Sequence, residues 1–212
     1  MKRLLLATHN QHKRREFARL LAGSGGQESW EMVALPAEVV LPPEDGDTFA
    51  ENALGKARAA AQATGEPSIA DDSGIEAAAL GGAPGVRSAR YAGESATDGE
   101  NLAKLIREAP AGSGLEYVCA IAYVDPRGHS EHLFEGRCRG RVAGEPRGER
   151  GFGYDPVFLP EESPPANGRE PADDSPLAAT MAELSDEQKD AISHRGKAAR
   201  ALLAFLEEID RG

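Results

Sequence analysis

The order of apolar and polar positions predicts that the chain opens with a strand, a loop and a helix. The mainly apolar segment Arg3–Ala7 is typical of a short buried strand. A polar turn follows, and the segment from about Gln11 to Leu21 has its apolar residues at helical spacing. A second apolar stretch covers Trp30–Leu35, and an acidic loop lies around Pro42–Asp47. The chain therefore begins as a strand–loop–helix unit.

The next segments predict a second helix and a second strand. The Ala-rich segment Thr48–Thr64 favours a helix because alanine has the highest intrinsic helix propensity. Thr48 and Glu51 form a capping-box sequence at its start. The short apolar segment Ser68–Ala70 follows, and we expect this buried strand to end at the polar sequence Asp71–Gly74.

Two later segments predict a β-hairpin. Glu116–Val124 and Ser130–Val142 alternate or run apolar, and the turn sequence Asp125–Gly128 separates them. Strands therefore occur both beside helices and beside each other, which favours a mixed sheet over a purely parallel one. We predict an α/β fold with a mixed, twisted sheet flanked by helices.

The last part of the chain contains a predicted loop and a final helix. Residues 160–176 are rich in Pro, Glu, Ser and Asp and offer little to bury, so we expect a mobile loop inserted in the domain. Ser185–Gln188 forms another capping box, and the chain ends in a helix that has Leu202 and Leu206 on its apolar face. Residues 1–212 are predicted to form a single domain, or one domain with two lobes.

The charge of the chain disfavours two classes of partner. Of 212 residues, 35 are acidic and 24 are basic, which gives a formal net charge of −11. This charge opposes a broad electrostatic grip on nucleic acid or on an anionic membrane. An anionic substrate would need a local basic pocket and a metal ion.

We expect a cytoplasmic protein without a membrane span. Met1–Ala7 imitates the start of a signal peptide, but the polar sequence Thr8–Asn10 ends the apolar run early. The sequence has no run of roughly 18 apolar residues. Cys119 and Cys138 have neither metal-ligand nor redox spacing, so we interpret both as reduced structural residues.

The first candidate for chemistry is Thr8–Lys13, where the first strand turns into a helix. Free backbone N–H groups and the positive end of the helix dipole would meet an anion there, and Lys13 would reach it from the first turn. The segment predicts a phosphate cradle without the glycines of a P-loop. An asparagine N-cap followed by a solvated lysine explains the same residues.

The second candidate is Asp71–Gly74, at the expected carboxyl end of a buried strand, where α/β folds usually place ligands. Carboxylate oxygens there suit Mg²⁺, which proteins hold with one or two carboxylates plus substrate phosphates. Glu44 in the acidic loop is the candidate for a second carboxylate. A turn capped by aspartates explains the pattern equally well.

The third candidate is Gly151–Pro156. Glycines let the backbone approach a planar ligand, an aromatic ring can stack on a base, and Asp155 can accept a base N–H. A tight turn before the strand Val157–Leu159 is the simpler explanation.

The fourth candidate combines Lys189 with Ser193–Arg195. Hypoxanthine and xanthine carry an oxygen at C6 where adenine carries an amino group, so donors such as Arg and His would select them. Guanine shares that oxygen, and no residue in the sequence identifies how its 2-amino group would be excluded. Compensation of helix dipoles explains the same cations.

Taken in order, these segments resemble the inosine triphosphate pyrophosphatase family, also called XTP/dITP diphosphatases. The match covers Leu5 to Leu203, and four separated motifs in register outweigh the simpler explanation of each. The segments that carry the resemblance are Ala7–Lys13 with Glu16, Phe49–Lys56, Ile69–Tyr91, Phe152–Pro156 and Ser193–Arg195.

The resemblance implies an elongated, two-lobed α/β fold with a central cleft, and a homodimer. It implies Mg²⁺-dependent hydrolysis of ITP, dITP and XTP to the nucleoside monophosphate and pyrophosphate, which removes aberrant purine nucleotides from the precursor pool. Asp72 would be the proton acceptor and, with Glu44, would hold the metal. The residues implied for substrate binding are Thr8, His9, Asn10, Gln11, His12, Lys13, Lys56, Ser73, Phe152, Gly153, Tyr154, Asp155, Lys189, His194 and Arg195.

The identity of the base stays open at this point. Mg²⁺ and lysines would neutralise developing charge while a carboxylate orients or deprotonates the water that attacks the α-phosphorus. A metal-bound carboxylate is a poor proton acceptor, however, so a metal-bound hydroxide is an alternative to Asp72.

The chain departs from the family pattern at Arg87, where a bulky residue such as tyrosine is frequent, and in the longer loop 160–176. Another phosphohydrolase or a kinase is disfavoured, because the sequence contains neither G-x-x-x-x-G-K-[ST] nor G-x-G-x-x-G. A nucleotide-binding regulator without turnover is disfavoured by the presence of Asp72, Glu44 and Lys13 together. The charge of −11 disfavours a nucleic-acid-binding module.

Overall fold

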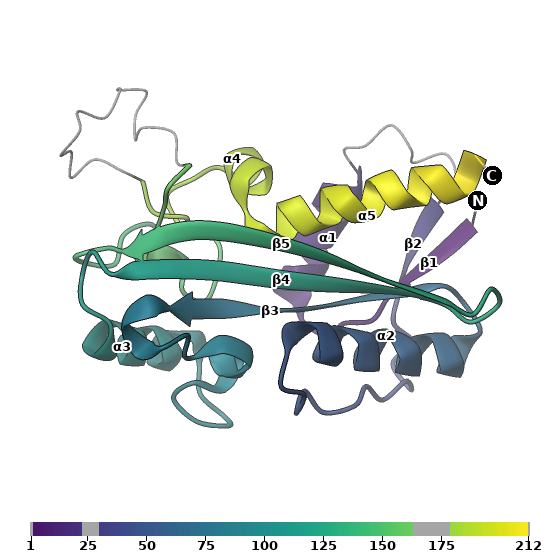
Figure 1. The fold of residues 1–212 in the computed structure, drawn as a ribbon, viewed down its shortest axis with the longest axis horizontal. Coiled ribbons are helices and arrows are strands. Elements are labelled where there is room, and N and C mark those ends of the chain that lie inside the picture. Colours follow the sequence, from purple (N-terminus) through teal and green to yellow (C-terminus); the bar gives the residue numbers. More distant parts are fainter. Residues whose placement is uncertain (1, 23–29, 163–178, 212) are drawn as a thin grey trace. The chain divides into compact units, whose positions relative to one another are not determined.

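The computed structural model describes residues 2–22, 30–162 and 179–211 (Figure 1). These residues form a six-stranded sheet with the strand order β2-β1-β3-β4-β5-β6. The strands are β1 (Lys2–Leu6), β2 (Trp30–Ala34), β3 (Ser68–Ala77), β4 (Gly114–Asp125), β5 (Ser130–Val142) and β6 (Phe158–Pro160). The helices are α1 (Gln11–Ala22), α2 (Phe49–Thr64), α3 (Asp98–Glu108), α4 (Asp186–Ile192) and α5 (His194–Arg211), with 3-10 turns η1 (Ala78–Leu80), η2 (Gly85–Arg90) and η3 (Asp155–Val157).

The sheet is mixed, as the sequence predicted. β1 pairs in parallel with β2 and with β3, whereas β5 and β6 pair antiparallel. The predicted α/β fold with helices flanking a mixed sheet is confirmed. Positions 163–176 of the predicted loop lie outside the described residues.

The chain divides into two compact units. Unit 1 consists of residues 1–73, 119–136 and 195–212, and unit 2 consists of residues 74–118 and 137–194. β3, β4 and β5 contribute residues to both units.

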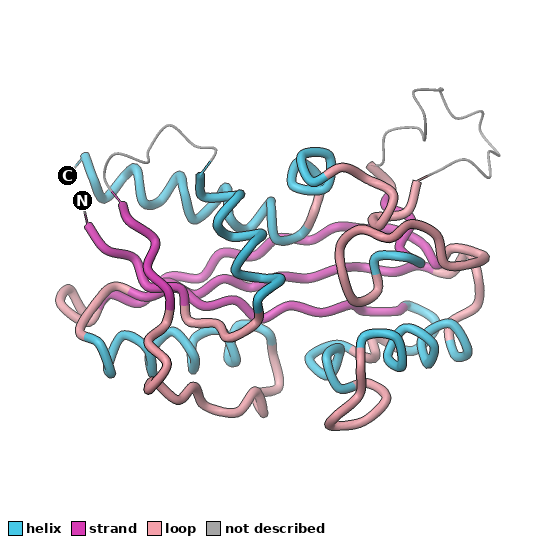
Figure 2. The backbone as a smooth tube through the Cα atoms, turned by 180° about the vertical axis from the view of Figure 1, so that it is seen from behind, coloured by secondary structure: helices cyan, strands magenta, loops and turns pink. Residues whose placement is uncertain are grey.

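In unit 1, helices cover both faces of the sheet. α1 and α5 lie on one face and α2 lies on the other, as both views of the backbone show (Figures 1 and 2). Period-two alternation in β1 turns Leu4 and Leu6 toward Phe17 of α1 and Leu202 of α5. The face of α2 that is buried consists mainly of alanines at helical spacing, namely Ala53, Ala57, Ala60 and Ala61.

The start of β1 and the end of α5 lie side by side in unit 1 (Figures 1 and 2). Lys2 Nζ lies 2.6 Å from Asp210 Oδ1, and Trp30 Nε1 donates a hydrogen bond to Asp210 Oδ2 at 2.8 Å. The last turn of α5 is thereby tied to the first two strands.

β3 differs from the sequence prediction. We expected the strand to end at Ala70, but it continues to Ala77, so Asp71–Gly74 lies inside the strand. Its parallel partner β1 is paired only as far as Leu6, which lies opposite Ile69. β3 remains next to β4 in the sheet, and its backbone therefore stays extended after β1 has ended. The two aspartates follow directly after that point.

Unit 2 has its own core, built from the second parts of β3 and β5, the first part of β4, β6 and α3. Ile75, Leu115, Cys138 and Phe158 pack there with Leu105 of α3. Helix α3 was not predicted from the sequence, although Thr97 and Glu100 form a complete capping box at its start. Both cysteines of the chain are buried and free of disulfide bonds. Within the described ranges, no helix is both long and apolar enough to cross a membrane.

The cap of α2 provides a test of local helix stability. Thr48 Oγ1 accepts a hydrogen bond from Glu51 N at 3.1 Å, and Glu51 Oε2 accepts one from Thr48 N at 3.1 Å. We expect Thr48→Ala to lower the free energy of unfolding in urea by about 1 kcal/mol. Gln62→Ala, at an exposed position of the same helix, is the control and should change it by less than about 0.5 kcal/mol. Equal losses in the two variants would contradict the role of the cap.

Candidate active site

The loop between β1 and α1 is organised by Asn10. Its Oδ1 accepts hydrogen bonds from the backbone N–H groups of His12 at 2.9 Å and Lys13 at 3.2 Å, so Asn10 caps α1. The side chains of His9, Asn10, Gln11 and His12 are exposed. The exposed N-terminus of α1 is a location where backbone N–H groups and the helix dipole favour an anion.

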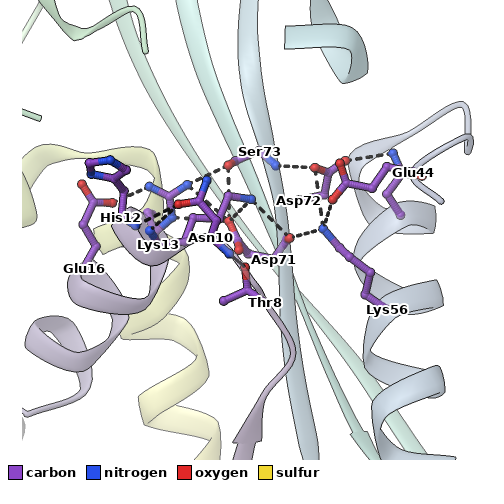
Figure 3. A network of polar contacts seen from close by, with 12 residues as sticks. Thr8, Asn10, His12, Lys13, Glu16, Glu44, Lys56, Asp71, Asp72 and Ser73 are labelled. Atoms are coloured by element: carbon purple, nitrogen blue, oxygen red, sulfur yellow. Dashed lines mark hydrogen bonds and ion pairs between the residues drawn. The ribbon is translucent and has the colours of Figure 1, made fainter. Parts of the chain in front are cut away.

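Lys13 points from the first turn of α1 toward β3 (Figure 3). Its Nζ lies 3.0 Å from Asp71 Oδ2 and 3.5 Å from the backbone oxygen of Asp71. The side chain is only 13% exposed. The alternative of a solvated lysine is therefore wrong, whereas the asparagine cap coexists with an inward-pointing Lys13.

Asp71 is the buried carboxylate at the centre of the network in unit 1. Its Oδ2 accepts hydrogen bonds from Arg195 Nη2 and from Ser73 Oγ, both at 3.3 Å. Arg195 is also ion-paired with Glu16, and its Nη2 donates to Ser73 Oγ at 2.7 Å. Burial alone would raise the pKa of Asp71, but the cations Lys13 and Arg195 hold it well below its usual range. The surrounding cations therefore favour the ionised form of Asp71.

Asp72 follows in the strand, and its carboxylate lies toward α2 (Figure 3). Its Oδ2 accepts a hydrogen bond from Asn52 Nδ2 at 2.9 Å, and its Oδ1 accepts one from Ser73 N at 3.0 Å. Burial raises the pKa of Asp72, Lys56 opposes this shift, and Glu44 adds to it. Both carboxylate oxygens are thus fixed in direction by hydrogen bonds from the chain.

Lys56 of α2 is held between the acidic loop and β3. Its ammonium is ion-paired with Glu44, donates to the backbone oxygen of Asp71 at 2.7 Å and lies 4.0 Å from Asp72 Oδ1. Burial opposes the charge on Lys56, but the surrounding carboxylates outweigh it and raise the pKa of Lys56. Lys56 is therefore a buried cation shared by two carboxylates.

Glu44 and Asp72 are the residues that could hold a divalent cation. Both lie close to the Lys56 ammonium, and their hard carboxylate oxygens suit Mg²⁺. In the part of the chain that the structure describes, no three His, Cys, Asp or Glu side chains are grouped as metal ligands. Two carboxylates fit a Mg²⁺ ion that keeps several waters and is completed by substrate phosphates.

In unit 2, the loop that begins at Gly151 is built around Asp155. The carboxylate of Asp155 accepts hydrogen bonds from Phe152 N at 3.0 Å, Lys189 Nζ at 2.7 Å and Tyr117 Oη at 3.0 Å. Gly151 has φ 73°, and a Cβ atom there would lie 2.0 Å from Asp155 Oδ2. Asp155 is 2% exposed, so its described role is to shape this loop. Its contact with a purine stays a prediction.

The aromatic residues of this loop differ in position. Tyr154 is buried in the core of unit 2 and donates a hydrogen bond to the backbone oxygen of Ser88 at 2.7 Å. Phe152 is only partly buried, and Lys189 Nζ lies 5.1 Å from its ring centroid. Phe152 is therefore the better candidate for stacking on a base.

The predicted site residues fall into two groups in the structure. Unit 2 contains Phe152–Asp155 and Lys189 together with His194, whose ring stacks on Tyr117 with centroids 4.5 Å apart. The sequence pattern grouped Arg195 with His194 and Lys189, but the described contacts of Arg195 are with the acidic network of unit 1. The members of the unit 1 group are Thr8, His9, Asn10, Gln11, His12, Lys13, Glu44, Lys56, Asp72, Ser73 and Arg195.

Three residues of the unit 1 network lie in segments singled out from the sequence, but no individual role was predicted for them. Asp71 and Glu16 hold Arg195, and Asn52 joins Asp72 to the acidic loop, because its Oδ1 also accepts a hydrogen bond from Gly46 N at 2.8 Å. Asn52 lies one helical turn before Lys56 in an Ala-rich helix, so both side chains lie on the same helix face. This spacing is the sequence feature from which a role for Asn52 could have been predicted.

Comparison with known proteins identifies the family. The chain matches the Ham1 family over residues 4–205 and belongs to it, which confirms the resemblance inferred from the motifs. It is 45% identical to the dITP/XTP pyrophosphatase of Gloeobacter violaceus, over 96% of this chain and 94% of that protein. It is 46% identical to the dITP/XTP pyrophosphatase of Frankia alni, over 98% of each.

Solved structures agree with this membership. A HAM1 protein from Coxiella burnetii superposes with a TM-score of 0.80 at 36% identity, covering 98% of this chain and 100% of that one. The Staphylococcus aureus Ham1 protein superposes with a TM-score of 0.77 at 36% identity, covering 98% of this chain and 99% of that one.

The buried ion pair in unit 2 can be tested by stability measurements. Lys189→Met leaves the Asp155 carboxylate buried without its cation, so we expect the free energy of unfolding to fall by about 3–5 kcal/mol. The double variant Lys189→Met/Asp155→Asn should lose less than the single variant, because no charge is left unpaired. Arg58→Met removes an exposed pair with Glu131 and should cost less than about 1 kcal/mol. Similar losses for Lys189→Met and Arg58→Met would show that the buried ion pair of Lys189 with Asp155 contributes no more to stability than an exposed pair.

Proposed function

We propose that this protein is an XTP/dITP diphosphatase that hydrolyses dITP, XTP and ITP to the nucleoside monophosphate and pyrophosphate. The observation that carries the proposal is the pair of buried aspartates in β3, with Lys13, Lys56 and Arg195 gathered around them. Family membership supports it, because relatives about as long as this chain are named dITP/XTP pyrophosphatases.

Unit 1 would bind the phosphates. Lys13 and the exposed N-terminus of α1 offer an ammonium and backbone N–H groups to an anion. The ion pair with Asp71 holds the Lys13 side chain toward β3. Lys13 therefore loses less side-chain entropy on binding a phosphate than a fully solvated lysine would. Asp71 would therefore act on the substrate through Lys13.

Glu44 and Asp72 would hold Mg²⁺, because their oxygens are the ligands that this ion prefers. When bound, Mg²⁺ supplies neutralisation of the charge on the phosphate oxygens. The two carboxylates come from a loop and a strand that Asn52 joins, since Asn52 bonds both Asp72 and Gly46 of the acidic loop.

Asp72 would orient the attacking water, whose proton passes to this carboxylate or to bulk solvent. The water oxygen forms a bond to the α-phosphorus while the bond from that phosphorus to the α–β bridging oxygen breaks, so pyrophosphate leaves with the electron pair. The hydrogen bonds from Asn52 and from Ser73 N hold the carboxylate in one orientation. Such positioning of a reacting group lowers the entropic part of the barrier.

Unit 2 would bind the purine. Phe152 can stack on the base, and Lys189 and His194 offer donors that suit an oxygen at C6. Arg195 would contribute to base selection as the family resemblance implies, from a guanidinium that Glu16 and Asp71 hold in place. A homodimer acting in the cytoplasm is the further expectation from the resemblance.

The function is tested by measuring pyrophosphate release from dITP, XTP, ITP, dGTP and ATP at equal concentration, with and without Mg²⁺. We expect Mg²⁺-dependent release from the first three nucleotides. Asp72→Asn should reduce the rate by at least about 100-fold, because the carboxylate that orients the attacking water is lost, while nucleotide binding is retained. Asp125→Asn, at the hairpin turn, is the control and should leave the rate unchanged.

Equal rates on all five nucleotides would refute the proposed selectivity. Nucleotide binding without any turnover by the wild-type protein would instead support a nucleotide-binding regulator.

A further inference from the structure

Lys56 occupies a position that two acidic side chains share. Its ammonium is ion-paired with Glu44 and lies 4.0 Å from Asp72 Oδ1 (Figure 3). These are the two carboxylates proposed to hold Mg²⁺. Lys56 is 6% exposed, so its charge is screened mainly by these carboxylates and not by bulk water.

The ion pairs around the two aspartates of β3 form two sets. Lys13 and Arg195 are paired with Asp71, and Arg195 is also paired with Glu16. The second set contains Lys56 with Glu44 and Asp72. The Lys56 ammonium thus interacts with two partly or fully buried carboxylates, which would otherwise repel each other more strongly.

We propose that Lys56 is the resident counter-ion of the metal position, and that a divalent cation displaces the Lys56 ammonium from Glu44. The displaced ammonium can then bind a substrate phosphate. Binding of the metal ion and reorientation of the Lys56 side chain toward the phosphate therefore occur together. This inference rests on the proposed function, because it takes the same two carboxylates as metal ligands.

The contacts of Lys56 make such an exchange practicable. The ammonium also donates to the backbone oxygen of Asp71 at 2.7 Å, a contact that does not involve a proposed metal ligand. Lysine is a compact charge on a flexible stem with three rotatable donors. Lys56 can therefore leave Glu44 and keep a buried hydrogen-bond partner in β3.

Exchange predicts competition between Lys56 and the metal. We expect Lys56→Met to bind Mn²⁺ about tenfold more tightly than the wild-type protein in the absence of nucleotide, a coupling of ordinary size. Binding is measured by electron paramagnetic resonance of free Mn²⁺. Equal or weaker binding by Lys56→Met, or no binding by either protein, would overturn the proposal.

Lys13→Met is the matched control, because it removes a second inward-pointing lysine that is paired with Asp71 and not with Glu44. We expect a clearly smaller gain in Mn²⁺ affinity for this variant. The same gain in both variants would show a general effect of charge and would overturn the exchange.

A measurement on the wild-type protein covers the case in which Lys56→Met does not fold. In ¹⁵N-labelled protein, the ammonium resonance of Lys56 should shift on titration with Mg²⁺ alone, and the resonance of Lys13 should shift less. An unchanged Lys56 resonance at saturating Mg²⁺ would overturn the proposal. Neither titration needs turnover, so pyrophosphate release from the same preparations reports separately on the proposed function.

Discussion

Two adjacent buried carboxylates in one strand are the constraint that organises unit 1. A buried ionised carboxylate is costly unless cations and hydrogen-bond donors surround it. Asp71 obtains Lys13 from α1 and Arg195 from α5, and Asp72 obtains Asn52 from α2. The helices on both faces of the sheet thus each contribute a polar side chain to the same segment of β3. The packing of α1, α2 and α5 on the sheet therefore also places the polar side chains of the site around β3.

Unit 2 also contains a buried carboxylate, that of Asp155, which is surrounded by hydrogen-bond donors and a cation. Its carboxylate collects donors from β4, from α4 and from the glycine-rich loop itself. Removal of a cation from either centre leaves an uncompensated buried charge, whereas exposed pairs such as Arg58–Glu131 contribute little. Among the described residues, most buried charges belong to residues that the family resemblance assigned to substrate or metal; Asp71 and Glu16 are exceptions, and both are paired with Arg195.

Much of this could be predicted from the sequence, because apolar periodicity and capping boxes act locally. The helix starting after Thr48 and the hairpin strand Ser130–Val142 were predicted with their observed limits. The predicted end of β3 was wrong, because polar residues usually mark the end of a strand. β3 continues because it stays next to β4 in the sheet, which the local sequence does not indicate. The contacts of Arg195 likewise depend on partners more than a hundred positions away, which spacing along the chain does not encode.

Asp72 is proposed to direct a water molecule to the α-phosphorus of a nucleoside triphosphate, while Asp71 holds Lys13 in position for the phosphates. Hydrolysis of dITP in ¹⁸O-labelled water, followed by mass spectrometry of both products, is the decisive test of that direction of attack. The label is expected in the nucleoside monophosphate, with unlabelled pyrophosphate as the other product. Label in pyrophosphate, or release of inorganic phosphate and dIDP, would refute it, because the attack would then fall on the β- or γ-phosphorus.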